Sequence, residues 1–406
     1  MEKSRKPKIR FKGFTDDWEQ RKAIDIADYS KGNGYSKGDL ADAGTPIILY
    51  GRLYTKYQFA ISEVDTFAVP RNGAVYSQGN EVIVPASGET AEDIARASAV
   101  EKSGVLLGGD LNILRPFDFM NPLFLALAIS NGEPQKELAK KAQGKSVVHI
   151  HNTDIQEVTI AYPSKTEQDR IVSVFRQLDN LITLHQRKLD KFVNVKKSML
   201  EKMFPKQGSK VPNIRFAGFA DDWEQRKVGE LGTITTGSTP STSIPDYYSD
   251  DGIVWVTPTD ICENITFESA RKLSDLGQQV GRVVPKNTIL VTCIASIGKN
   301  TMLGNTGSFN QQINGLTPNE KECDPYFLLT ESALWSAKMK SSAAAGTMQI
   351  VNRTEFSELK TWLPNLIEQQ AISDFFRQLD NLITLHQRKL EKLKNIKKSM
   401  LEKMFI

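Results

Sequence analysis

The feature that most constrains this chain of 406 residues is a long helical segment that occurs twice. Residues 167–204 and 368–405 align at an offset of 201 positions, and residues 175–189 are identical to residues 376–390. Neither copy contains Gly or Pro, and both are rich in Leu, Lys, Gln and Glu, which favour helix formation. Each copy therefore predicts one continuous helix, roughly 55 Å long at about 1.5 Å per residue.

Apolar residues recur along each copy in alternating steps of four and three residues, which is the heptad pattern of a coiled coil. A lone helix of this kind would expose its apolar seam, and the simplest partner for one copy is the other copy. The pattern by itself is equally typical of a general coiled-coil dimeriser. The residues expected to pair the helices are Phe175, Leu178, Ile182, His185 and Leu189 in the first copy and Phe376, Leu379, Ile383, His386 and Leu390 in the second.

Two polar residues interrupt each seam, and they fall at the same heptads in both copies. His185 and His386 form the first interruption. A polar pair that sets the helix register is favoured there over a metal site, and no metal is expected. Lys196 and Lys397 form the second interruption, and their long side chains are expected to extend out of the seam towards water.

A second repeat lies near the start of each half, where residues 9–22 recur as residues 214–227. The chain is therefore a duplication in which a module and a helix are followed by another module and helix. A period near 200 residues indicates duplicated domains, not a solenoid. We divide the chain into a first domain (1–166), a first helix (167–204), a linker with the second domain (205–367) and a second helix (368–406). Antiparallel helix pairing would give it internal pseudo-twofold symmetry.

Each module mixes short β-like runs, interrupted by Gly and Pro, with short helical segments, which predicts an α+β fold. The full expectation is two α+β domains separated by an antiparallel pair of long coiled-coil helices. Strands are expected at residues 82–84, 147–150, 253–256 and 288–291, and helices at residues 123–130 and 326–341.

Bulk properties narrow the class of protein. The net charge is +4, so a nucleic-acid partner would have to be bound by local basic patches. The first residues lack the apolar core of a secretion signal, and no apolar run is long enough to span a membrane. The three cysteines follow no CxxC pattern, which argues against a disulfide framework and a zinc site. These features predict a cytoplasmic protein with reduced thiols and no membrane partner.

Two segments imitate catalytic motifs. Residues 139–146 are similar to a phosphate-binding loop, but Ala139 replaces its first Gly and a β-like run follows where a helix should begin. Asn121-Pro122-Leu123-Phe124 imitates an adenine methyltransferase motif, but its second Pro is missing and no Gly-rich cofactor loop precedes it. We interpret the first as a basic surface and the second as a helix start.

A series of short motifs follows in order through the second module: GSTPS at 237–241, WVTPTD at 255–260, SIGK at 296–299, NQQ at 310–312 and GT at 346–347. Pro364-x-x-x-Glu368-Gln369 then begins the helix. Together with the duplicated helix, this order resembles the specificity subunit of type I restriction-modification systems over essentially the whole chain. The first module keeps Ser87-Gly88-Glu89 and Pro163-x-x-x-Glu167-Gln168, but it has no evident Gly-x-Thr-Pro loop near its start.

The resemblance implies a non-catalytic subunit whose two modules are target recognition domains for double-stranded DNA, each reading one half of a split, asymmetric site. It implies helices that hold the modules apart and bind two methyltransferase (modification) subunits, which modify adenines with S-adenosylmethionine as their own cofactor. Restriction endonuclease/translocase subunits would join them. No cofactor is expected in this chain. The rival interpretation is a structural coiled-coil adaptor whose two domains bind proteins.

Candidate DNA-contacting residues follow from side-chain chemistry and from the resemblance. Arg and Lys can bind guanine edges and phosphates, hydroxyl and backbone N–H groups can bind phosphates, and Gln can read adenine. The alternatives are an amphipathic strand with a solvated face in the first module and loop capping in the second. The candidates are Arg52, Tyr54, Lys56, Tyr57, Ser87 and Lys145 in the first module, and Gly237, Ser238, Thr239, Ser241, Thr259, Ser296, Lys299, Gln311, Gln312 and Thr347 in the second.

Overall fold

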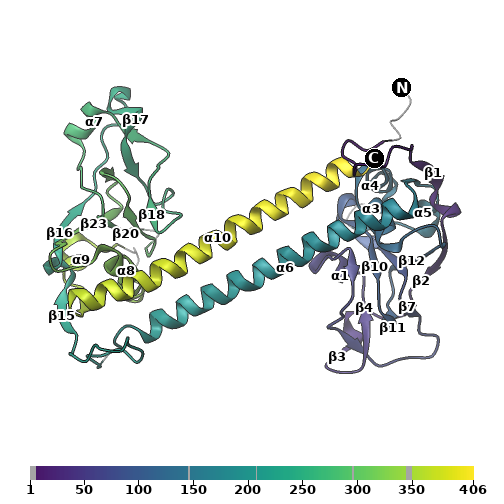
Figure 1. Cartoon of the computed structure of the whole chain (residues 1–406), viewed down its shortest axis with the longest axis horizontal. Helices are drawn as coiled ribbons and strands as arrows, with labels where there is room; N and C mark the ends of the chain where they lie inside the picture. The colour runs from purple at the N-terminus through teal and green to yellow at the C-terminus, as the bar shows by residue number, and fades with distance from the viewer. Residues whose placement is uncertain (1–5, 145–146, 207, 295–296, 344–349) are drawn as a thin grey trace. The chain divides into compact units, whose positions relative to one another are not determined.

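The structure is a computed structural model that describes residues 6–144, 147–206, 208–294, 297–343 and 350–406 (Figure 1). The chain divides into two compact units. Unit 1 comprises the chain up to His185 together with Arg388–Ile406, and unit 2 comprises Gln186–Gln387. Each unit therefore contains one α+β module, the first part of the helix that follows this module, and the last part of the other long helix.

The duplicated segment forms α6 (Lys165–Lys202) and α10 (Leu366–Met404), which are each drawn as one uninterrupted helix in Figure 1. In unit 1 the first part of α6 packs against the last part of α10, and in unit 2 the last part of α6 packs against the first part of α10. The two helices therefore run antiparallel, and the predicted helix pair is confirmed.

Ion pairs between the helices explain the second polar interruption of the seam. In unit 1 the Lys397 ammonium donates to Asp179 at 2.5 Å, and in unit 2 the Lys196 ammonium donates to Asp380 at 2.6 Å. The lysines were expected to extend towards water, but a carboxylate of the facing helix lies within reach and holds each of them. Because the same pairing occurs in both units, it fixes one antiparallel register.

The predicted seam residues lie on the covered side of the helices. Phe175 and Phe376 are fully buried, and the His386 ring lies 5.5 Å from that of Phe192. Among the residues that the structure describes, no three His, Cys, Asp or Glu side chains gather as metal ligands would. Leu379 and Leu390 are buried, and Leu178, Ile182, His185, Leu189 and Ile383 are half-buried.

The first module contains two main sheets, in strand orders β2-β12-β8-β10-β5 and β3-β6-β4-β11-β7. Most pairs are antiparallel, but β10–β5 and β11–β4 are parallel. The predicted strand around Val82 and the predicted helix after Asn121 are both confirmed. The strands are β2 (Ala27–Lys31), β3 (Leu40–Ala41), β4 (Thr45–Ile48), β5 (Ala60–Ile61), β6 (Phe67–Ala68), β7 (Tyr76–Gln78), β8 (Glu81–Pro85), β10 (Ser98–Val100), β11 (Ser103–Leu107) and β12 (Leu111–Pro116), with helices α1 (Arg52–Thr55), α2 (Ala91–Ile94), α3 (Pro122–Ile129), α4 (Gly132–Lys141) and α5 (Asn152–Gln156).

The second module repeats this plan with strand orders β16-β23-β20-β21-β18 and β19-β17-β22. Its β17–β22 pair is parallel, as is the β11–β4 pair of the first module. The predicted strands and the long predicted helix are confirmed here as well. The elements are β16 (Gly232–Thr236), β17 (Tyr248–Val256), β18 (Ile265–Thr266), β19 (Lys272–Leu273), β20 (Ile289–Thr292), β21 (Asn300–Leu303), β22 (Gly307–Phe309) and β23 (Ile313–Pro318), with α7 (Asp275–Val280), α8 (Pro325–Ala343) and α9 (Arg353–Ser357).

The repeated N-terminal segment of each half attaches the module to the start of its helix. Strand β1 (Glu19–Lys22) pairs with β14 (Thr159–Tyr162), which leads into α6, and β15 (Glu224–Lys227) pairs with β24 (Lys360–Leu363), which leads into α10. Before these strands, the Arg10 guanidinium forks onto the buried carboxylate of Glu167, with both N–O distances 2.7 Å. Arg215 and Glu368 repeat the pair at 2.7 and 2.8 Å. The hydrogen bonds that Arg10 donates to the Glu167 carboxylate raise the pKa of Arg10.

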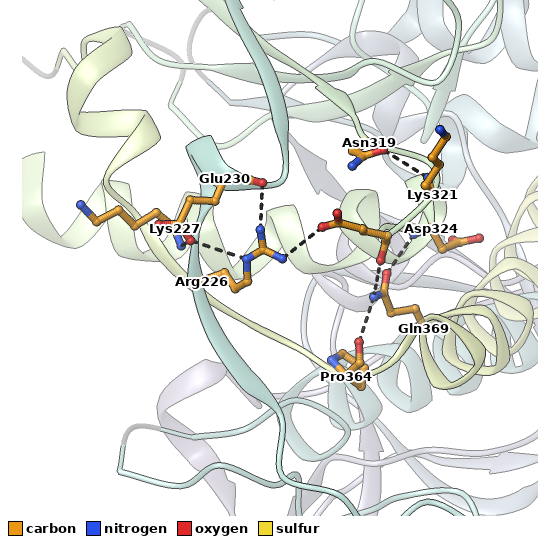
Figure 2. A network of polar contacts seen from close by, with 9 residues as sticks. Arg226, Lys227, Glu230, Asn319, Lys321, Asp324, Pro364 and Gln369 are labelled. Carbon is orange, nitrogen blue, oxygen red and sulfur yellow. Dashed lines mark hydrogen bonds and ion pairs between the residues drawn. The ribbon is translucent and has the colours of Figure 1, made fainter.

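The glutamine that follows each buried glutamate bonds to the backbone of its own module. Figure 2 shows Gln369 in unit 2, where its amide donates to the carbonyl of Pro364 at 2.9 Å and its oxygen accepts from the Asp324 N–H at 2.9 Å. Gln168 makes the matching contacts to Pro163 and Asn121 in unit 1. Because these amides satisfy backbone groups at the module boundary, the Glu-Gln pair orients the helix start.

The end of each long helix completes the core of a module. In unit 1 the Phe405 ring packs 5.7 Å from Phe124 and 6.1 Å from Phe175. In unit 2 the Phe204 ring packs 5.5 Å from Phe327 and 6.1 Å from Phe376. Phe405 follows α10, yet it lies in the core of the first module, so each module requires the helix that follows the other module.

Truncating Phe405 should therefore weaken unit 1. We expect Phe405→Ala to cost about 3–5 kcal/mol, because it removes a buried aromatic ring and leaves a cavity. Urea denaturation would measure the loss, and hydrogen exchange would locate it. Phe267→Ala is the control, since this ring is 54% exposed. Unchanged amide protection in the first module would contradict this role of Phe405.

A buried carboxyl group lies between α8 and β24 in the second module. Glu331 is 3% exposed and accepts hydrogen bonds from the Thr361 hydroxyl and, at 3.2 Å, from the Trp362 N–H. Burial raises the pKa of Glu331 to about 7, because desolvation penalises the ionised form more than these hydrogen bonds favour it.

The raised pKa makes the stability of the second module depend on pH. Between the ordinary glutamate pKa and 7, the unfolded chain is ionised while the folded Glu331 keeps its proton, so stability falls as the pH rises through this window. The loss amounts to about 3 kcal/mol. We expect Glu331→Gln to remove this slope between pH 5 and 8 in urea titrations. A slope identical to that of the unsubstituted chain would rule the assignment out.

Candidate functional site

Two loops of the second module begin at the same edge of its smaller sheet. Strands β17 and β22 are parallel neighbours, with Trp255 opposite Ser308, so the residues that follow them emerge side by side. The Asn310 N–H donates to the Val256 carbonyl at 3.0 Å, which joins the two loops at their first residues. Residues 257–260 form the first loop and residues 310–312 form the second.

A third loop, residues 237–243, follows β16 and lies against the second. The Ser238 N–H donates to the Phe309 carbonyl at 2.9 Å, and the Thr239 hydroxyl donates to the Gln311 side-chain oxygen. A Cβ at Gly237 would lie 2.1 Å from the Asn310 carbonyl oxygen, so only glycine allows the backbones to approach this closely.

Two cationic side chains join these loops. The Lys299 ammonium donates to the Pro258 carbonyl at 2.9 Å. Arg282 donates through its backbone N–H to the Ser238 hydroxyl at 3.0 Å and through its guanidinium to the Thr236 carbonyl at 2.6 Å. The sequence interpretation did not include Arg282, because it belongs to no motif and only the fold brings it to the loop.

Most of the residues predicted for the second module therefore gather at one place. Thr259 lies within hydrogen-bond distance of Thr257 at 2.8 Å, Gln312 accepts from Asn310 at 3.0 Å, and Ser241 contacts Ser243 at 2.7 Å. The arrangement presents hydroxyl groups, amides and two cations on loops that are joined by hydrogen bonds. Ser296 and Thr347 lie outside the described residues. The gathered set is Gly237, Ser238, Thr239, Ser241, Thr259, Lys299, Gln311 and Gln312.

In the first module the predicted cations are bound within the fold. The segment after Gly51 forms a helical turn, α1, where the alternative had been an amphipathic strand. Lys56 and Arg52 each approach the carboxylate of Asp65 at 2.5 Å, and they hold its pKa well below the usual range. Arg52 also donates to the Glu63 carbonyl at 3.0 Å, and its side chain is only 9% exposed.

The other predicted residues of the first module also have partners within it. The Tyr54 hydroxyl donates to the Ser87 carbonyl at 2.5 Å, and burial raises the pKa of Tyr54. The Ser87 hydroxyl lies 3.1 Å from His149 Nδ1, and the Tyr57 hydroxyl lies 3.3 Å from the Ala97 carbonyl. Lys145 lies outside the described residues. DNA contact by this group stays a prediction, and the structure shows these side chains supporting the fold.

The family profile and the curated relatives that match this chain all belong to one family. The profile described as "Type I restriction modification DNA specificity domain" matches residues 15–192 and 220–395. Among curated relatives, the MjaIX specificity subunit of Methanocaldococcus jannaschii is 28% identical over 46% of this chain and 44% of its own length, so the chain spans less than half of that relative. The putative MjaX specificity subunit of the same organism is 23% identical over 73% of this chain and 70% of its own length.

A solved structure shares the fold across the full length. The type I restriction-modification S subunit from M. genitalium is 14% identical, covers 99% of both chains and superposes with a TM-score of 0.67. Across the described residues, no helix combines the length and the apolar character needed to cross a membrane.

Proposed function

The chain belongs to the family of type I restriction-modification DNA specificity domains, and from this premise we propose that it is the DNA sequence-recognition subunit of such a complex. Each module would read one half of a bipartite, asymmetric site in double-stranded DNA. The observation that carries the proposal is the edge of the second module where residues 237–243, 257–260 and 310–312 meet with Lys299 and Arg282.

The chemistry of this edge suits a DNA groove. Gln311 and Gln312 provide the paired donor and acceptor that match an adenine edge. Lys299 and Arg282 can neutralise phosphates, and hydroxyl groups such as that of Ser238 can bond to phosphate oxygens and fix the orientation of the module on the duplex. The close backbone contacts hold the three loops together, so recognition requires little reorganisation.

The long helices would dock two methyltransferase subunits, which carry S-adenosylmethionine and methylate adenine. The same exposed stripe occurs on both helices, next to the buried seam. It begins with Leu181 and Leu184 on α6 and with Leu382 and Leu385 on α10, all four of them exposed. Lysines follow at positions 188 and 191 and at positions 389 and 392. One surface present twice suits two copies of one partner, and endonuclease/translocase subunits would join this assembly.

Exchanging one module tests the division of labour. We expect that replacing residues 228–364 with the equivalent region of a related subunit will change one half-site and leave the other unchanged, because the core that this region forms with the adjoining helix ends is separate from the core of the first module. Methylome sequencing of a host that carries the chain and its methyltransferase partner would report both half-sites. A change in both half-sites would contradict the modular interpretation, and absence of any bipartite site would favour the protein adaptor.

Two substitutions at the candidate edge should have different effects. Lys299→Gln should weaken binding to all DNA sequences and reduce the salt slope by about one, as expected for a phosphate contact. Gln311→Ala should reduce discrimination at one base pair by about 1–3 kcal/mol. Fluorescence anisotropy of the assembled complex on a set of single-base duplex variants would measure both. Matching thermal melting curves serve as the control, and identical effects of the two variants would count against these roles.

A further inference from the structure

The first module lacks the Gly-x-Thr-Pro signature, yet its backbone identifies the loop that corresponds to it. The Gly32 N–H donates to the Leu111 carbonyl at 3.0 Å, as the Gly237 N–H donates to Ile313 at 3.1 Å. The next residue, Asn33, donates to the Leu107 carbonyl at 3.1 Å, as Ser238 does to Phe309. The segment that follows β2 is therefore the counterpart of the segment that follows β16.

The close approach at the glycine is also repeated. A Cβ at Gly32 would lie 1.9 Å from the Gly108 carbonyl oxygen, as one at Gly237 would lie 2.1 Å from Asn310. The Gly108 N–H donates to the Ile48 carbonyl at 2.9 Å, which repeats the bond between Asn310 and Val256. Residues 108–110 therefore correspond to residues 310–312, and the residues that follow Ile48 correspond to residues 257–260.

A buried asparagine below the loops confirms this alignment. Asn112 Nδ2 donates to the Ile150 carbonyl at 2.9 Å, and Asn314 Nδ2 donates to the Val351 carbonyl at 3.4 Å. The residues that accept these bonds also correspond, since the Ile150 N–H donates to the Ala86 carbonyl and the Val351 N–H donates to the Cys293 carbonyl. The framework under the loops is thus the same in both modules, although few of its side chains are identical.

In the first module the three corresponding loops surround one cavity of about 780 Å³. Ion pairs hold two of the residues that line it, Asp65 and Asp39. Arg52 and Lys56 hold Asp65, and Arg71 pairs with Asp39, donates to the Gly34 carbonyl at 3.3 Å and lies over the Tyr35 ring at 5.1 Å. Lys37, Tyr50 and Asp110 line this cavity and remain exposed. The exposed Asn33 directly precedes the lining residue Gly34, and its amide donates to the Gly73 carbonyl at 2.7 Å.

Resting on the proposed function, we propose that Asn33, Lys37, Tyr50 and Asp110 form the DNA-reading surface of the first module. Asp110 occupies the position of Gln312, and a carboxylate accepts hydrogen bonds from the exocyclic amino group of cytosine. Asp110 also has a φ of 56°, a left-handed conformation that Asp and Asn adopt more readily than most residues. Lys37 would bind a phosphate.

The assignment gives Arg52 a positioning role. Arg52 is the fourth residue after Ile48, as Asp260 is the fourth after Val256. Asp260 also holds its own loop, since its carboxylate accepts from the Thr257 N–H at 2.8 Å and from the Ala270 N–H at 2.9 Å. Arg52 and Asp260 have opposite charges, but each of them holds its loop through contacts within its own module. We therefore assign base discrimination to the exposed residues around Arg52.

The test compares Asp110→Asn with Asp118→Asn in the full chain assembled with its methyltransferase partner. Asparagine keeps the left-handed backbone but replaces an acceptor by a donor. Asp118 is an exposed carboxylate of the same module outside the cavity and serves as the control. Lys37→Gln is the second variant. Anisotropy on single-base duplex variants gives the preference at each position, and the module exchange identifies which half-site belongs to the first module.

We expect Asp110→Asn to change base preference about tenfold or more at one position of the first half-site, with the second half-site within twofold. Lys37→Gln should lower affinity for all duplexes and reduce the salt slope by about one. If both variants leave preferences and salt slope unchanged, or if Asp110→Asn alters the second half-site, the assignment is wrong although the proposed function stands. If the unsubstituted complex recognises no bipartite site, the proposed function itself fails.

Discussion

The phenylalanine that follows each long helix packs into the core of the module that precedes the other helix, and the rest of the architecture depends on this contact. Phe405 lies among Phe124 and Phe175 in unit 1, and Phe204 lies among Phe327 and Phe376 in unit 2. Neither module with only its own helix would fill its core. The heptad seam, the Lys–Asp pairs and these rings therefore favour the same antiparallel arrangement, and consistent local preferences of this kind define one fold.

The sequence predicted the parts of the fold that depend on periodicity. The long, uninterrupted apolar repeat predicted the helices α6 and α10, and the Pro-x-x-x-Glu-Gln motif predicted where each of them begins. It could not predict that Lys397 would bind Asp179, because the partner lies 218 positions away and only the register of the paired helices brings the two together. The role of Arg10 was hidden for the same reason, since its buried partner Glu167 is 157 positions distant.

Residues of the candidate site could be predicted from the sequence where they belong to a motif. They could not be predicted where only the backbone hydrogen bonds of the folded chain identify the loop. Gly237, Thr239 and Gln311 belong to recognisable motifs, and the structure brings them together. In the first module the alternation of basic and aromatic residues indicated Arg52 and Tyr54, but their side chains are held by Asp65 and Ser87. An isolated pattern of charges does not reveal whether a carboxylate elsewhere in the chain will bind them.

The two modules show why the loop surface can change while the fold persists. Gly32 and Gly237 are required because a side chain at either position would overlap a carbonyl oxygen of the neighbouring loop. The contacts that join the loops in both modules, such as those from the Gly108 and Asn310 N–H groups, are backbone hydrogen bonds, which any residue except proline can make. Side chains at corresponding loop positions are therefore free to differ, as those of Asp110 and Gln312 do. A framework of this kind can present a new donor and acceptor pattern without a new fold, which is what the proposed reading of two unlike half-sites requires.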